Sequence, residues 1–288
     1  SKANPDLYEI SFTEHLLDSL TEGARAIVII PQSSVTGKSK EEQNIKNNIL
    51  KSHTLEGVIT LNKNTFYGVG TNPCIAVFTA GIPHDKNHLC KFINFEDDGE
   101  GILKADLVFN ALYRDGDLPQ VKAGEKYYIS GKTFMFYKPI QIKENVKRVF
   151  ISFGGADPQN YSDRILKIVS GEEYRGYQFA VVLGRAKYNI DTLMEYNKYE
   201  NIKVFYDVDN MPEIMSSCDI GITSRGRTGY ELAILGIPSI SMAQNHREEK
   251  HGFVCNENGF SYIGLNPEDE VIKATLDMYL KMSQKGRQ

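Results

Sequence analysis

This chain of 288 residues has few cysteines, a small net charge and no long apolar run. Its four cysteines form no Cys-x-x-Cys pair, which argues against a zinc site and favours reduced thiols. The formal net charge of −4 argues against a generally basic nucleic-acid binder. No apolar run approaches the roughly 18 residues of a membrane span, and the opening SKAN is no signal peptide. We therefore expect a cytoplasmic protein with no membrane span, metal or resident cofactor.

In the first half of the chain, apolar runs alternate with helical patterns. Residues 11–20 and 41–53 have helical spacing, and strands are predicted at 25–31, 55–61, 74–80 and 105–113. The continuous apolarity of the run RAIVIIP, residues 25–31, is typical of a strand buried on both faces, as in a parallel sheet. Strands separated by helices predict an α/β domain.

The alternation is more regular from residue 147 onward. Strands are predicted at 147–153, 177–184, 202–206, 219–223 and 238–242, with helices at 162–169, 190–199, 211–217, after Ser224, and at 268–282. This order predicts a second doubly wound domain. The segment KPIQIKEN, within residues 138–146, has little apolar periodicity. We therefore predict two doubly wound, mainly parallel-sheet α/β domains, residues 1–138 and 139–288.

Two loops at strand ends of the second domain have the composition of an anion site. Gly154 and Gly155 follow one strand, and paired glycines let backbone N–H groups approach a ligand. The other loop, Ser224-Arg225-Gly226-Arg227-Thr228, opens a helix, whose first N–H groups and positive partial charge favour phosphate. Arginine adds charge-assisted hydrogen bonds to such oxygens.

Three further polar residues extend this candidate site. Glu231 lies one turn into the helix and is suited to ribose hydroxyls, and Gln244 and Asn245 follow the next strand and are suited to sugar hydroxyls. Each feature also has an ordinary structural interpretation: a Gly-Gly pair is commonly a tight turn, and Ser224 or Thr228 can simply cap a helix. The two loops together favour an anion site.

Residues 95–288 resemble a known family. The motifs are FEDDGEGILKADLVFNALY, FGGADPQN, NMPEIMSSCDIGIT, RGRTGYELAILGIPSI and AQNHREEKHGF followed by NENGF. They are similar to the UDP-sugar hydrolases of pseudaminic acid biosynthesis and to spore-coat polysaccharide biosynthesis proteins. Those proteins share the two-domain GT-B fold with the N-acetylglucosaminyltransferase of peptidoglycan synthesis. The resemblance implies a GT-B-like second domain that belongs to bacterial surface-polysaccharide or nonulosonic-acid biosynthesis.

The same resemblance implies roles for the candidate residues. Gly154 and Gly155 would lie near the diphosphate of UDP or a UDP-sugar, residues 224–228 would cradle it, and Glu231 would bind the ribose. Gln244 and Asn245 would face the sugar. In that family an N-terminal Gly-x-Gly-His loop contributes to catalysis, and this sequence contains no such string. Hydrolase or transferase turnover therefore stays open, and no catalytic residue is assigned.

Residues 1–92 resemble a different family. The stretch from FTEHLLDSLTEG to GTNPCIAVFT is similar to the methyltransferase subunit of type I restriction–modification systems, where it supplies the later strands of an adenine-N6 methyltransferase sheet. That family's glycine-rich cofactor loop and its Asn-Pro-Pro-aromatic motif are not found in this sequence. The two resemblances meet at FEDDG, residues 95–99, which makes a chimera the simplest account. A natural protein, a methyltransferase fragment and an inactive scaffold are the alternatives.

The sequence predicts that the first domain binds no S-adenosylmethionine, because both motifs that hold and use this cofactor are missing from it. A calorimetric titration tests this, and micromolar affinity for S-adenosylmethionine would refute it. The lysines at 38, 40, 46 and 51 allow only weak DNA binding, which should weaken further as salt is raised.

Overall fold

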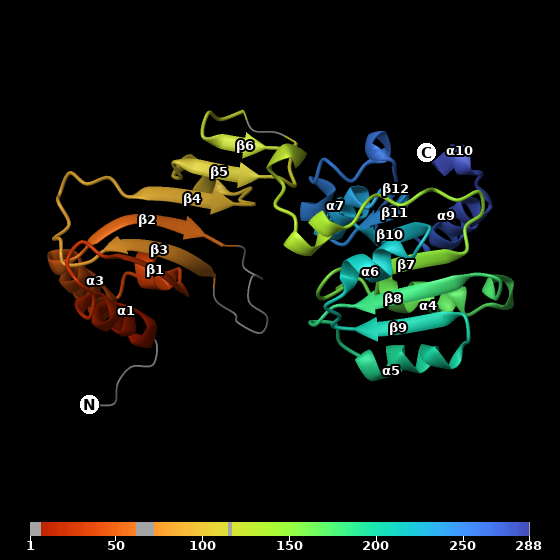
Figure 1. Cartoon of the computed structure of the whole chain (residues 1–288), viewed down its shortest axis with the longest axis horizontal. Helices are drawn as coiled ribbons and strands as arrows, with labels where there is room; N and C mark the ends of the chain where they lie inside the picture. Colours follow the sequence, from red (N-terminus) through yellow and green to blue (C-terminus); the bar gives the residue numbers. More distant parts are fainter. Residues whose placement is uncertain (1–6, 62–71, 115–116, 288) are drawn as a thin grey trace. The chain divides into compact units, whose positions relative to one another are not determined.

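The computed structural model describes residues 7–61, 72–114 and 117–287. The chain divides into two compact units. The first contains residues up to Ala111 together with Asp115–Ala123, and the second contains Leu112–Arg114 and Gly124–Gln288. Each unit has one six-stranded sheet (Figure 1). The units therefore divide earlier in the chain than the predicted boundary, and segment 124–138 belongs to the second unit.

The sheet of the first unit has the strand order β1-β3-β2-β4-β5-β6. Its strands are β1 (Arg25–Pro31), β2 (Thr54–Thr60), β3 (Pro73–Thr79), β4 (Lys91–Phe95), β5 (Leu107–Asn110) and β6 (Val121–Ala123). Its helices are α1 (Tyr8–Asp18), α2 (Ser33–Thr36) and α3 (Lys40–Ser52). Ile10 and Leu17 of α1 and Ile49 of α3 join one buried cluster with the strands. Ser39 begins α3 with a capping box to Glu42.

Strand β1 differs from the prediction made for it. It lies at one end of the strand order and pairs antiparallel with β3, rather than between parallel neighbours. Ala26 and Ile30 are buried in the cluster with α1 and α3, whereas Ile27 and Ile29 are 67% and 58% exposed. The prediction of burial on both faces is therefore wrong for this strand. Among residues 7–61, 72–114 and 117–287, a packed layer covers only one face of β1, although both faces are apolar.

The second sheet is entirely parallel, with the strand order β12-β11-β10-β7-β8-β9. Its strands are β7 (Arg148–Ser152), β8 (Gln178–Leu183), β9 (Ile202–Tyr206), β10 (Ile220–Ser224), β11 (Ser239–Ala243) and β12 (Phe260–Leu265). Side chains of β7, β10 and β11 are almost all buried, as expected of strands covered on both faces.

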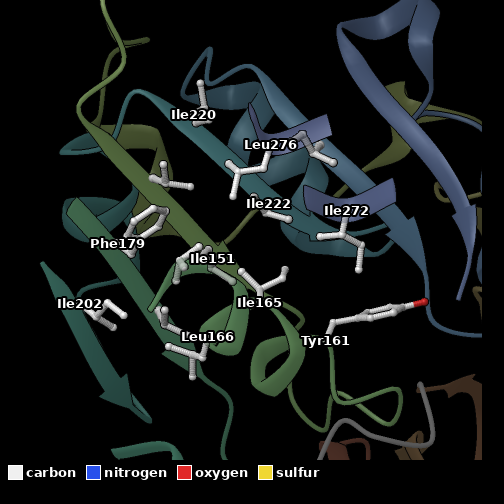
Figure 2. Packing of buried hydrophobic residues seen from close by; sticks show 14 of the residues in the cluster. Ile151, Tyr161, Ile165, Leu166, Phe179, Ile202, Ile220, Ile222, Ile272 and Leu276 are labelled. Carbon is white, nitrogen blue, oxygen red and sulfur yellow. The ribbon is translucent and has the colours of Figure 1, made fainter. Parts of the chain in front are cut away.

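Helices cover both faces of the second sheet (Figure 1). They are α4 (Tyr161–Val169), α5 (Ile190–Met194), α6 (Met211–Ser216), α7 (Arg227–Ile234), α8 (His246–Glu249), α9 (Asp269–Lys281) and α10 (Gln284–Arg287). On one face, Ile165 of α4 and Leu276 of α9 pack against Ile151 and Ile222 (Figure 2). On the other face, Met215 of α6 and Leu232 of α7 pack against Phe150.

These two sheets confirm the predicted fold class of two mainly parallel α/β units. Strands β4, β6 and β12 were not predicted. Their residues are mostly half-buried, so none of them has the solid apolar run that marks a central strand. Strand β12 extends the parallel sheet beyond residue 242, where the predicted sheet ended.

The two adjacent isoleucines of β1 provide a test of its uncovered face. Ile30→Ala should lower the free energy of unfolding by about 2–4 kcal/mol, because it opens a cavity in the core. Ile29→Ala should change it by roughly 0.5 kcal/mol or less, because this side chain is exposed. Urea denaturation of both variants measures the difference. An equal cost for the two would mean that the second face of β1 is also covered.

Candidate functional site

The order of the second sheet places two predicted loops side by side. Strand β7 is the first strand of the second unit but lies inside the sheet, with β8 and β9 on one side and β10, β11 and β12 on the other. The connections therefore reverse direction between β7 and β10, which are hydrogen-bonded parallel neighbours. In open α/β sheets, ligands bind outside the carboxyl ends of the strands at such a reversal. Gly154 follows β7 there, and Arg225 follows β10.

The loop after β7 has open space beside its glycines. A Cβ atom added to Gly154 or Gly155 would meet no atom within 4 Å. Gly154 has a φ of +73°, a conformation that favours glycine, whereas Gly155 has no such requirement. The absence of a side chain at Gly155 therefore leaves its backbone accessible rather than relieving a clash within the protein.

The loop after β10 leads directly into α7. Gly226 is the N-cap residue of α7, and no side chain caps the first turn. Ser224 is buried below this turn, Thr228 is half-buried and Arg227 is exposed. The uncapped first turn retains unpaired N–H donors and the positive end of the helix dipole. The structure thus joins residues 224–228 into one helix start, as the sequence predicted.

The guanidinium of Arg225 does not lie free at this helix start. It is buried and donates hydrogen bonds to the carbonyl oxygens of Glu249, at 3.1 Å, and of His251. It also lies over the ring of Tyr262, 4.2 Å from the centroid. Arg225 therefore ties the loop after α8 to the end of β10. This corrects the expectation that its guanidinium faces an anion.

Glu231 is the carboxylate nearest in sequence to the helix start. It is half-buried, and no hydrogen bond to its side chain occurs among residues 7–61, 72–114 and 117–287. Burial raises the pKa of Glu231 to about 7, although the positive charge of Arg227 lowers it. A desolvated carboxylate with unfilled acceptor positions is suited to hydroxyl donors from a ligand.

The side chains of Gln244 and Asn245 both make hydrogen bonds within the protein. The side-chain amide of Gln244 donates to the Phe153 carbonyl oxygen at 3.1 Å and to Glu248 at 3.2 Å, so it links the end of β11 to the end of β7. Its Oε1 atom is buried and has no hydrogen-bond partner in the described structure. Asn245 is exposed and caps α8 by accepting from the Glu248 N–H at 3.0 Å.

Glu248 is a site residue that the sequence reasoning missed. Its carboxylate accepts from the Gln244 N–H at 2.9 Å and also from the backbone N–H of Arg225, so it joins the ends of β10 and β11. Burial raises the pKa of Glu248, and these hydrogen bonds oppose the shift. The spacing of Asn245 and Glu248 was the available signal, since an N-cap residue with an acidic side chain three positions later resembles a capping box.

An aromatic stack supports α7 from its outer side. Tyr230 of α7 stacks between Tyr128 and Phe253, with ring centroids 4.2 and 4.4 Å apart. The Tyr128 hydroxyl donates to the Arg227 carbonyl oxygen at 3.4 Å. The Tyr-rich segment after residue 124 thus packs against the helix that begins at the candidate site. Sequence spacing alone could not reveal this contact, because the partners lie about a hundred residues apart.

Comparison with known proteins identifies different relatives for different parts of the chain. The family described as N-6 DNA Methylase matches residues 2–112. The restriction enzyme and methyltransferase RM.BcgI of Heyndrickxia coagulans is 51% identical over 98 residues, which are 34% of this chain and 15% of that protein. The resemblance of the N-terminal part to N6 methyltransferases is therefore confirmed.

Other relatives match more of the chain. Uncharacterized protein MJ1062 of Methanocaldococcus jannaschii is 30% identical over 209 residues, 63% of this chain and 41% of that protein. The UDP-N-acetylglucosamine–N-acetylmuramyl-(pentapeptide) pyrophosphoryl-undecaprenol N-acetylglucosamine transferase of Halalkalibacterium halodurans is 29% identical over 129 residues, 42% of this chain and 36% of that enzyme. The chain spans less than half the length of each of these three relatives.

Solved structures also align with most of the chain. Anabaena Alr3699/HepE in complex with UDP-glucose has a TM-score of 0.45 and 14% identity, and the alignment covers 69% of this chain and 65% of that one. In the part of the chain that the structure describes, no helix is long and apolar enough to cross a membrane. The same residues contain no cluster of three His, Cys, Asp or Glu side chains able to hold a metal ion.

The raised pKa of Glu231 predicts a pH-dependent stability difference. Its folded-state pKa is about 7 against an ordinary value of 4.5, so the folded protein holds this proton more tightly than the unfolded chain. Glu231 therefore destabilises the fold increasingly as pH rises from 4.5 to 7. Glu231→Gln removes this effect, and its gain in unfolding free energy over the wild type should be larger at about pH 8 than at about pH 5. Urea denaturation at both pH values measures it, and an equal difference at both would contradict the assignment.

Proposed function

We propose that the second unit binds a nucleotide sugar, UDP or a UDP-sugar, at the carboxyl ends of β7 and β10. The observation that carries the proposal is the meeting of an open Gly-Gly loop and an uncapped helix start at the reversal point of the sheet. Both features present backbone N–H groups, and both favour an anion. The similarity to a transferase whose name specifies a UDP-N-acetylglucosamine substrate supports the same ligand class.

In this proposal the diphosphate lies between Gly155 and the first turn of α7. Arg227 is exposed at that turn and supplies the positive charge of this loop, since Arg225 is buried. Glu231, half-buried one turn further on, accepts hydrogen bonds from the ribose hydroxyls. Gln244 and Asn245 lie at the next strand end, where a sugar attached to the diphosphate would extend. Arg225, Gln244 and Glu248 hold the strand ends in place through their own hydrogen bonds.

We further propose that the protein belongs with hydrolases or glycosyltransferases of bacterial surface-polysaccharide or nonulosonic-acid biosynthesis. Turnover in either class requires a base that activates water or an acceptor hydroxyl, while the N–H groups stabilise the leaving diphosphate. The residues described here supply the second of these requirements.

A second candidate function applies to the first unit. The match of residues 2–112 to N-6 DNA Methylase favours a fragment of a DNA methyltransferase. Combined with the nucleotide-sugar resemblance, this favours a chimera in which methyltransferase strands form the first unit. The two candidates differ in ligand, so parallel titrations with UDP and S-adenosylmethionine separate them.

Substitutions at Gly155 and Glu231 should weaken UDP binding without disturbing the fold. Gly155→Val places a branched side chain in open space where the diphosphate is proposed to lie. Gly155→Val blocks the backbone hydrogen bonds to the diphosphate, and Glu231→Ala removes those to the ribose. A charged hydrogen bond is worth about 1.5–3 kcal/mol, so each substitution should lower UDP affinity about tenfold or more. Calorimetric titration measures both, and uridine should bind the wild type far more weakly than UDP.

Gly176→Val is the matched control, because a Cβ atom at Gly176 also meets nothing within 4 Å and this residue precedes β8, at the amino end of that strand. It should leave UDP affinity unchanged. Equal affinity of the wild type for uridine and UDP would reject the diphosphate site, as would indifference to both substitutions.

A further inference from the structure

The loop after β8 lies directly against the Gly-Gly loop after β7. A Cβ atom at Gly184 would collide with the carbonyl oxygen of Gly154 and with the backbone of Gly155. The Ala186 N–H donates to the Gly155 carbonyl oxygen at 2.9 Å. The position of one loop is therefore fixed by the other, and any side chain at Gly184 would push them apart.

A buried lysine completes this contact. The side chain of Lys187 is 2% exposed, and its Nζ lies 3.0 Å from Oδ2 of Asp157, whose side chain is 4% exposed. The same Nζ donates to the Asn160 Oδ1 atom at 2.8 Å and to the Asp157 carbonyl oxygen at 3.3 Å. Its three N–H donors are thus all used by the loop after β7.

Asp157 transmits this contact to the helix that follows. Its carboxylate accepts from the backbone N–H groups of Tyr161 and Ser162, both at 2.9 Å, at the start of α4. Asp157 and Asn160 both have a positive φ, 45° and 56°, a conformation that is uncommon for non-glycine residues, although Asp and Asn adopt it most readily. Lys187 bonds to both of these residues and so ties the two turns of this loop together.

We propose that Lys187 is a positioning residue for the diphosphate site, a role that rests on the UDP-binding function proposed above. It does not contact the ligand, because its donors are already occupied. It fixes residues 154–160 so that the N–H groups beside Gly155 are aligned before UDP arrives. A loop that is already aligned loses less conformational entropy when the ligand binds. Loss of Lys187 therefore selectively lowers the affinity for ligands that carry the diphosphate.

The test compares UDP with uridine in calorimetric titrations of the wild type and Lys187→Met. We expect UDP affinity to fall about tenfold or more and uridine affinity to change by less than about twofold, because only the diphosphate uses the loop. A merely structural role would lower both affinities together and leave their ratio unchanged. Hydrogen exchange of amides 154–160 in the unliganded variant should also become faster.

Lys187→Met leaves a buried carboxylate without its counter-charge and could prevent folding. The double variant Asp157→Asn/Lys187→Met removes both charges, keeps an acceptor oxygen at position 157 and should show the same selective loss. Lys143→Met is the control for loss of a lysine partner from a buried carboxylate. The Lys143 side chain is 63% exposed and pairs at 2.7 Å with Asp219, which also accepts two backbone N–H groups but lies at the amino ends of β7 and β10.

The outcomes separate the two proposals. Wild-type protein that binds no UDP rejects the proposed function and the role of Lys187 with it. Wild-type protein that binds UDP, together with folded Lys187 variants whose ratio of UDP to uridine affinity is unchanged, rejects the role of Lys187 alone. An equal loss of that ratio in Lys143→Met would also reject it, because the effect would then not depend on the loop after β7.

Discussion

The reversal of strand order between β7 and β10 is the constraint on which the rest of the second unit depends. Because β7 is the first strand of the second unit and lies inside the sheet, its outgoing loop and the loop of β10 lead away to opposite sides. No covalent connection bridges the two strand ends at that point. Backbone hydrogen bonds join the strands themselves, and two side chains connect the loops beyond them: Gln244 donates to the Phe153 carbonyl oxygen and to Glu248, which accepts from the Arg225 N–H. The candidate site and its supports are both consequences of this topology.

The polar residues around the reversal point form two groups: those whose side chains make hydrogen bonds within the protein, and those whose side chains are free to bond to a ligand. Arg225, Asp157 and Lys187 are buried and bonded to backbone or to one another. The side chains of Glu231 and Arg227 make no hydrogen bond within the part of the chain that the structure describes. Polar groups with satisfied partners give rigidity, whereas a desolvated carboxylate without partners retains its capacity to bind. This division narrows the proposed binding site to one turn of α7, a smaller region than the sequence motif covers.

Sequence patterns predicted the parts of this structure that depend on local periodicity. The buried strands β7, β8, β10 and β11 have solid apolar runs, and the helix after β10 begins where the sequence predicted it, directly after Ser224 and Arg225. Patterns failed where neighbours decide the outcome. The apolar run of β1 gives the strand two apolar faces, but the sequence does not indicate whether a second layer of the protein covers the outer face. The direction of the Arg225 side chain and the pairing of Lys187 with Asp157, thirty residues away, likewise depend on tertiary contacts.

Strand β1 has consequences for how the protein behaves in solution. Between Arg25 and Pro31 lie five aliphatic residues, AIVII, on a strand at the end of its sheet. Natural sheets usually protect such an edge with lysine, with a bulge or with a covering element. A charge-free aliphatic segment of high β-propensity with a bare backbone edge is a template for intermolecular strand pairing. We therefore expect β1 to be a site of intermolecular strand pairing when the protein is concentrated, whether or not the second unit holds a ligand.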